Sequence, residues 1–387
     1  MNNSLVRVKW ICFNGIERGA SLRLAFWTSR RLVLQENILK RCLLWIVLAC
    51  SAVAQVPEIP YDSVPNLLKL PPDLYLGEVS GVAVNSKKHI FVFSRGNTTG
   101  PAYGATAAQL LEFSAEGKYI REIGKNLYAW SYAHAVRIDA EDNVWAVDKG
   151  SDMIVRFNAE GRVTMLFGRK KEASDDAKPW THVNPSLPAV DGQFRQPTDV
   201  TWDPQGDIFI SDGYINSRVA KYDKNGDWVK QWGEHGAKPG EFSTPHSIAA
   251  DSKGNIYVAD RGNRRIQVFN SDGTYLREIT IDVPIPPDAH PWMGNQPTTE
   301  AAAKQNGAPW AICITPGPTQ YLYASDAFPG RVYKLSLDGQ VLGVLGRSGR
   351  QSKQFGWIHE MACPSENEIY VAELLNWRVQ KLILHPK

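Results

Sequence analysis

Three of the eight histidines in this 387-residue chain stand at the same position of a repeated segment and could bind a metal ion together. They are His134, His246 and His359, each second in its segment: AHAVRID, PHSIAAD and IHEMACP. Three imidazoles with an open fourth position form a catalytic zinc site, although neutral imidazole also suits other transition metals. A single such histidine would more simply bond to water or to a backbone carbonyl, so the shared position is what favours zinc.

These segments belong to six repeated units, which must position the histidines. Spaced 48 to 65 residues apart, the units open at Val79, Ala133, Pro197, Pro245, Trp310 and Ile358. Each holds two short apolar segments, and the first five continue into two more joined at a Gly turn, as in IQVFNSDGTYLREIT. Such turns connect antiparallel strands. Four short strands per unit, without helical periodicity, predict an all-β fold: a six-bladed β-propeller of four-stranded antiparallel blades.

The sixth unit ends at RVQKLIL (378–384) and lacks a fourth strand. Because an unpaired sheet edge invites aggregation, we expect an N-terminal strand to close the ring. The candidate is NLLKL at 66–70, just before the first unit. The chain accordingly divides into a leader at 1–54, an N-terminal segment with the closing strand at 55–73, and the propeller at 74–387.

The repeat register predicts that the three histidines form one site. Neighbouring blades of a six-bladed ring are rotated by about 60°, so alternate blades lie about 120° apart around the axis. The histidines occur in the second, fourth and sixth units. Since the innermost strand of each blade lines the central channel, we expect the three imidazoles to face one common point.

A second register follows the next strand of each unit and brings Arg95, Lys149, Tyr214 and Arg261 to one rim of the ring. Arginine binds carboxylates through two parallel hydrogen bonds. A tyrosine near cations can have a pKa low enough to act as a base. The alternative is an ordinary loop rim with solvated charges, and the residues alone leave both interpretations open.

Composition and charge exclude several classes of protein. With 43% hydrophobic and 21% charged residues, the chain is too apolar to be disordered. Residues 1–54 carry a net charge of +6 and the rest of the chain −3, so the body is not expected to bind nucleic acid. We expect a monomer. Two cysteines follow the leader, Cys313 and Cys363; they could pair, but the size of the chain favours buried thiols.

The leader has the features of a secretory signal. Lys40 and Arg41 precede an apolar run at 42–54 that ends in Ala-Val-Ala. A basic region, an apolar run and small residues predict a signal peptide at 37–54 and a secreted or periplasmic protein. The alternatives are an uncleaved N-terminal anchor or a lipid anchor at Cys50, and only through these would the chain reach a membrane.

Four stretches of the sequence resemble peptidyl-α-hydroxyglycine α-amidating lyases, which are NHL-repeat propellers. They are YLGEVSGVAVNSKKHIFVFSRG, QPTDVTWDPQGDIFISDGYINSRV, FSTPHSIAADSKGNIYVADRGNRRIQVF and the segment around His359. The resemblance implies that His134, His246 and His359 bind zinc and that Tyr214, Arg95 and Arg261 are catalytic. It also implies a structural calcium ion held by the carbonyls of Val82 and Val136 and by the Glu360 carboxylate. The chain departs from the family at Glu360, where the family has Asp, and at Trp357, where it has Met.

The function that the resemblance implies is a secreted, zinc-dependent carbon–nitrogen lyase. It would cleave a peptide or small molecule ending in an α-hydroxyglycine-like carbinolamide to an amide and glyoxylate. The first alternative is a non-catalytic NHL propeller that binds protein or glycan and holds a structural metal. A propeller lactonase is a second alternative, disfavoured because such sites rely on carboxylate and amide ligands rather than three histidines.

Overall fold

The computed structural model describes residues 56–96, 108–170, 190–289 and 306–385. The leader at 1–54 and its signal peptide at 37–54 lie outside these residues. Within the described part of the chain, no helix has the length and apolar character needed to cross a bilayer.

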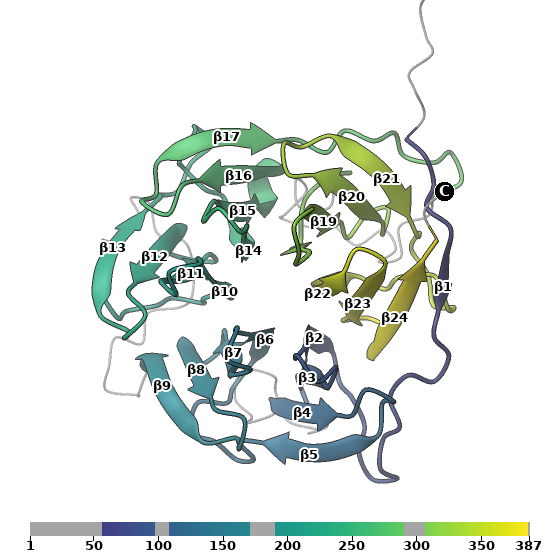
Figure 1. Cartoon of the computed structure of the whole chain (residues 1–387), viewed down its shortest axis with the longest axis horizontal. Coiled ribbons are helices and arrows are strands. Elements are labelled where there is room, and N and C mark those ends of the chain that lie inside the picture. The colour runs from purple at the N-terminus through teal and green to yellow at the C-terminus, as the bar shows by residue number, and fades with distance from the viewer. Residues whose placement is uncertain (1–55, 97–107, 171–189, 290–305, 386–387) are drawn as a thin grey trace, which may run out of the picture. The chain divides into compact units, whose positions relative to one another are not determined.

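Six four-stranded antiparallel sheets are arranged around one axis, which confirms the predicted six-bladed β-propeller (Figure 1). The first three blades are β2 (Val79–Val84), β3 (Ile90–Ser94), β4 (Gln109–Phe113), β5 (Tyr119–Ile123); β6 (Ala133–Ile138), β7 (Val144–Asp148), β8 (Met153–Phe157), β9 (Val163–Gly168); and β10 (Asp199–Trp202), β11 (Ile208–Asp212), β12 (Arg218–Tyr222), β13 (Trp228–Trp232).

The next two blades are β14 (Pro245–Ala250), β15 (Ile256–Asp260), β16 (Arg265–Phe269), β17 (Tyr275–Ile279); and β18 (Ala311–Ile314), β19 (Tyr321–Ser325), β20 (Val332–Ser336), β21 (Val341–Leu345). The sixth consists of β22 (Ile358–Ser365), β23 (Glu368–Glu373), β24 (Arg378–Leu384) and β1 (Tyr61–Ser63). A short 3-10 helix, η1 (Arg261–Asn263), follows β15.

Burial explains why the blades stack. The second strands, such as β3 and β15, are buried along their whole length, because both faces of the sheet meet neighbouring blades. The outer strand β17 instead alternates between half-buried and exposed residues and is buried only at its last residue, Ile279, as expected of a half-solvated strand. The inner strands β2, β6, β10, β14, β18 and β22 each contact the inner strands of both neighbouring blades. Side chains at equal heights on them are therefore brought together at the axis.

Buried acidic residues fix the loops at one rim. Asp212, at the end of β11, lies 2.9 Å from Arg218 at the start of β12, and Asp260 pairs in the same way with Arg265. Asp148 accepts the backbone N–H groups of Gly150 and Ser151 at 3.0 and 2.9 Å. These buried acidic residues thus tie down the loops that carry the rim residues.

The outer strand of the sixth blade is β1, not residues 66–70. Tyr61, Asp62 and Ser63 pair antiparallel with Leu384, Ile383 and Leu382 of β24. The backbone then turns at Asn66, whose φ of 49° lies in the left-handed region that asparagine tolerates. Residues 66–70 consequently run along the first blade, where the Lys69 N–H donates to the Gly117 carbonyl at 2.8 Å. The expectation for 66–70 was wrong because its apolar residues pack on that blade instead.

A disulfide joins Cys313 in β18 to Cys363 in β22, so the expectation of two buried thiols was wrong. The two residues are 50 positions apart in sequence, but their Cα atoms are 6.0 Å apart because β18 and β22 are neighbouring inner strands. This is an ordinary separation for a disulfide. The bond links the fifth and sixth blades covalently near the axis.

Replacing both cysteines by serine is expected to lower the free energy of unfolding by about 4 kcal/mol, since a crosslink closing a loop of this length restricts the unfolded chain by that much. Denaturant unfolding monitored by tryptophan fluorescence would measure the loss. Reduced wild-type protein should show the same destabilisation. Equal unfolding free energies for oxidised wild type and the double variant would contradict this prediction.

Candidate metal centre

The structure brings the three histidines together at the axis. His134 lies in β6, His246 in β14 and His359 in β22, and their ring centroids are 4.5–4.8 Å apart. One nitrogen from each ring lies within 4.8 Å of the other two. The side chains are almost fully enclosed, with exposed fractions of 1%, 1% and 4%. Their arrangement is the one that the repeat register predicts.

A β-bulge presents each histidine. The pairing of β6 with β7 runs through Ala133 and Ala135 and skips His134. The same break occurs around His246 in β14 and around His359 in β22. A bulged residue leaves the regular ladder and its side chain is re-aimed, which is why such bulges occur next to functional sites. The three imidazoles share a height because the same irregularity occurs in the second, fourth and sixth blades; the first blade has it too, around Ser80.

Each imidazole is held in the same orientation by the next blade. The Nδ1 atoms of His134, His246 and His359 lie 2.6, 2.7 and 2.8 Å from backbone carbonyl oxygens of Thr198, Trp310 and Ser80. A carbonyl oxygen can only accept, so Nδ1 carries the hydrogen in all three rings and Nε2 carries the lone pair. Metal-binding histidines are typically fixed through this kind of outer hydrogen bond.

The electrostatic environment keeps the rings neutral. Burial, which disfavours the charged form, lowers the pKa of all three histidines well below the usual range, and neighbouring imidazole and basic groups add to the shift. Neutral imidazole is the form that binds metal. Three convergent Nε2 lone pairs with fixed tautomers therefore fit a zinc ion or a similar transition metal.

Tyr214 stands directly over the imidazoles. Its hydroxyl lies 3.1 Å from Nε2 of His246 and 3.3 Å from Nε2 of His134. The preceding residue, Gly213, makes this approach possible, because a Cβ atom there would lie 1.8 Å from the Pro245 carbonyl oxygen. The turn after β11 can thus lie against β14 and bring the phenol hydroxyl within hydrogen-bonding distance of the nitrogen atoms that would bind the metal.

Basic and aromatic side chains surround the phenol. The Lys149 ammonium lies 3.5 Å from the centroid of the Tyr214 ring, and the Arg261 guanidinium lies 5.5 Å from it. Arg261 also lies 4.1 Å from the ring of Trp310, which in turn packs 4.9 Å from His246. Cations over aromatic faces are attracted by the ring quadrupole. The structure thus brings Arg261 and Tyr214 together with the histidines.

Arg95 lies on the same rim, between the first and second blades. Its guanidinium forms an ion pair with Glu78 and donates from Nε to the Ala133 carbonyl at 3.2 Å. It also stacks 3.9 Å from the ring of Tyr132, which lies 5.8 Å from the Lys149 ammonium. A continuous row of basic and aromatic groups therefore leads from Arg95 to Tyr214.

Sequence reasoning missed three of these neighbours: Trp310, Tyr132 and Glu78. A signal existed for each. Trp310 is the first residue of the fifth unit, whereas Tyr132 and Glu78 stand immediately before the second and first units. These positions precede the histidine register by one or two residues and therefore lie at the same rim.

The Glu360 carboxylate, which the sequence proposes as a calcium ligand, has other partners in the structure. One oxygen of Glu360 accepts the backbone N–H groups of Val82 and Val136 at 3.1 and 3.0 Å. The other oxygen lies 3.0 Å from Nε of Arg137, so a fixed cation already stands beside it. Calcium requires six to eight oxygen ligands. With a guanidinium fixed beside its carboxylate, Glu360 is poorly suited to binding calcium, and no step below depends on calcium.

Comparison with known proteins identifies relatives of this chain. The family model of the NHL repeat matches residues 242–269. Peptidyl-glycine alpha-amidating monooxygenase A of Xenopus laevis is 27% identical over 331 residues, covering 78% of this chain and 31% of that protein. Peptidyl-alpha-hydroxyglycine alpha-amidating lyase 1 of Drosophila melanogaster is 26% identical over 337 residues, covering 80% and 57%. The chain is a relative of the amidating lyases. The resemblance in the sequence is thus confirmed.

Two further comparisons concern the fold and the NHL repeats. NHL repeat-containing protein 3 of Homo sapiens is 30% identical over 217 residues, covering 52% of this chain and 54% of that protein. The structure of virginiamycin B lyase from Staphylococcus aureus has a TM-score of 0.52 at 13% identity, covering 85% of this chain and all of that one, and shows the shared fold alone. This chain spans about a third of the Xenopus relative and less than two thirds of the other two relatives.

Proposed function

We propose that this protein is a zinc-dependent lyase that cleaves the C–N bond of α-hydroxyglycine-type carbinolamides. The observation that carries the proposal is the Tyr214 hydroxyl, which lies within 3.3 Å of two convergent imidazole Nε2 atoms whose tautomers are fixed. We infer that this hydroxyl is a proton-transfer group at the open fourth position of a three-histidine metal site, as a catalytic centre requires. Relatives named as amidating lyases support the same reaction class.

The reaction needs one proton removed and one supplied. The substrate hydroxyl loses its proton, and its oxygen forms the aldehyde C=O of glyoxylate. The C–N bond breaks at the same carbon. The nitrogen takes up a proton and leaves as the amide. Zinc bound by the three histidines would act as a Lewis acid that favours the charged form of the substrate oxygen. Tyr214 is placed to take the hydroxyl proton at its phenolic oxygen. Lys149, 3.5 Å from the ring, stabilises negative charge on the phenol.

The carboxylate of the substrate calls for a basic partner, and two are present at the rim. Arg261 is buried beside Trp310 and Tyr214, and Arg95 lies farther along the row of aromatic groups. A guanidinium can hold a carboxylate through two hydrogen bonds and thereby orient the carbinol carbon. We expect the leaving amide to point toward solvent in this orientation, where a peptide or small molecule could extend.

Secretion, partners and oligomeric state belong to the same proposal. The predicted signal at 37–54 would direct the chain out of the cytoplasm as a secreted or periplasmic protein, or hold it to a membrane by the leader. The Cys313–Cys363 disulfide supports an oxidising compartment. We expect a monomer that acts on a small molecule or peptide and does not bind nucleic acid.

Turnover of α-hydroxyhippurate by the zinc-loaded protein tests the proposed function. The expected products are benzamide and glyoxylate in equal amounts, and activity should be lost with the metal and restored by zinc. Stoichiometric zinc without turnover of this substrate or of short peptidyl-α-hydroxyglycines would instead favour the non-catalytic NHL propeller. Protein and glycan binding would then be the property to measure.

Arg95→Ala is expected to raise KM for α-hydroxyhippurate by about 10-fold or more, because a charge-assisted hydrogen bond contributes about 1.5–3 kcal/mol. The neutral amide analogue of the substrate should be affected far less, since it lacks the carboxylate. Steady-state kinetics with both compounds would measure the difference. The exposed Arg162→Ala is the control. Equal effects of Arg95→Ala on the two compounds would exclude a carboxylate-binding role.

A further inference from the structure

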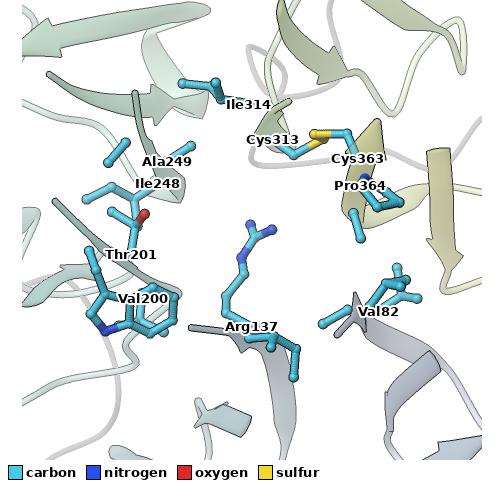
Figure 2. A pocket seen from close by; sticks show the side chains of 16 residues that line it. Val82, Arg137, Val200, Thr201, Ile248, Ala249, Cys313, Ile314, Cys363 and Pro364 are labelled. Carbon is cyan, nitrogen blue, oxygen red and sulfur yellow. A yellow bond between two sulfur atoms is a disulfide. The ribbon is translucent and has the colours of Figure 1, made fainter. Parts of the chain in front are cut away.

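We propose that the Arg137 guanidinium is a built-in cation on the propeller axis that joins all six blades, positions the metal-binding histidines and takes the place of a second, divalent metal ion. Arg137 lies in β6, three residues after His134. Figure 2 shows its side chain extending from that strand to the middle of the space between the blades. This inference concerns the metal site and stands apart from the proposed lyase activity.

The guanidinium reaches four other blades directly. Its Nε and Nη2 atoms donate to the two carboxylate oxygens of Asp199 in the third blade at 2.8 and 2.5 Å. Nη2 also lies 3.2 Å from the Ser247 hydroxyl of the fourth blade and 3.4 Å from the Ile312 carbonyl of the fifth. Nη1 donates to the Met361 carbonyl of the sixth at 3.0 Å. One side chain thus connects the second to the sixth blade.

Glu360 completes the connection. One of its oxygens lies 3.0 Å from Arg137 Nε. The other accepts the N–H of Val82 in β2 and the N–H of Val136 in β6. The first blade is therefore tied to the same group of contacts. A cluster made of Arg137, Asp199, Ser247 and Glu360, here called the axial cluster, links the inner strands of all six blades.

The axial cluster lies directly beneath the metal centre. Ser247 follows His246 and Glu360 follows His359 in the chain, whereas Asp199 follows Thr198, whose carbonyl holds the His134 ring. The space enclosed between the histidines and this cluster is too small to hold a water molecule. Any displacement of the cluster therefore moves the backbone that carries the imidazoles and their hydrogen-bond partners.

The charges explain why a cation is needed at this point. Asp199 and Glu360 are 1% and 2% exposed, and an unpaired buried carboxylate is strongly destabilising. Burial acts to lower the pKa of Arg137, but the two carboxylates outweigh it and raise that pKa, so the side chain stays charged. On the other side of Arg137 lies a cavity of about 250 Å³, lined by apolar residues and the disulfide (Figure 2). The guanidinium closes the axis between this cavity and the histidines.

The test compares wild type, Arg137→Met and Arg137→Lys. The control is Arg156→Met, at the one partly exposed position of the otherwise buried strand β8. Arg137→Met removes the charge at similar volume, and Arg137→Lys keeps the charge but not the forked donors. We expect Arg137→Met to weaken Co²⁺ binding at the histidine site by about 10- to 100-fold, the usual effect of losing a group that orients metal ligands. Its visible Co²⁺ absorption spectrum should change, and Arg137→Lys should recover part of the affinity.

Calcium provides a second readout, and the measurement on wild type does not depend on the variants folding well. Wild type should show no bound calcium by equilibrium dialysis and no shift of its Tm on adding Ca²⁺. Arg137→Met, with two buried carboxylates left, should be stabilised by Ca²⁺. One bound calcium per wild-type chain would overturn the proposal, as would an unchanged Co²⁺ affinity and spectrum in Arg137→Met. Neither result depends on glyoxylate release, so failure here is distinguishable from failure of the proposed lyase function.

Discussion

Replacing His246 by alanine is expected to reduce bound zinc from one ion per chain to almost none. The remaining imidazoles of His134 and His359 would supply two ligands, too few for the three-ligand arrangement of catalytic zinc sites. The fold should persist, because His246 sits at a β-bulge outside the regular ladder of β14. Loss of zinc should abolish glyoxylate release as well.

Elemental analysis after dialysis against zinc-free buffer would measure this effect, with circular dichroism as a check on the fold. His235→Ala is the matched control, since this histidine is exposed and lies outside the repeat register. Full zinc occupancy in His246→Ala would show that the ion is bound elsewhere and would remove the basis of the proposed active site.

Tyr214→Phe is expected to lower kcat for α-hydroxyhippurate by about 10²- to 10⁴-fold, the usual contribution of a positioned proton-transfer group. Zinc content should be unchanged, because the three imidazole nitrogens and their carbonyl partners remain. The effect should fall on kcat more than on KM, since the phenol faces the reacting hydroxyl rather than the carboxylate.

Steady-state kinetics and metal analysis on one preparation would separate chemistry from metal loss. Tyr275→Phe, which removes a hydroxyl from the outer strand β17, is the control. A Tyr214→Phe protein with wild-type kcat and full zinc would mean that another group takes the proton, and the role of Tyr214 would have to be abandoned.

Most of the fold could be predicted from the sequence because each blade repeats one local pattern. The four-strand period and the Gly turns are readable in every complete unit. The outer strand β1 could not be predicted, because its three residues of mixed polarity show no recognisable strand pattern. The more apolar segment at 66–70 resembles a strand in sequence but packs on the first blade. Pairing with a distant strand decides such short segments, not local preference.

The repeat register predicts which residues meet at the site, but not the backbone geometry and hydrogen bonds that orient them. The register correctly brings His134, His246 and His359 together, but it gives no indication of the bulges that aim them or of the carbonyls that fix their tautomers. The Cys313–Cys363 bond could have been inferred from it, since both residues lie on neighbouring inner strands. Arg137 was overlooked because a single arginine in an apolar strand has no visible partner in the sequence.

The central claim is that one ion is bound at the axis by Nε2 atoms from alternate blades, and X-ray diffraction across the zinc absorption edge tests it most directly. We expect a single strong anomalous peak on the axis, about 2.0–2.1 Å from Nε2 of His134, His246 and His359. No peak between these nitrogens in zinc-loaded crystals, or a peak bound by other side chains, would contradict the account.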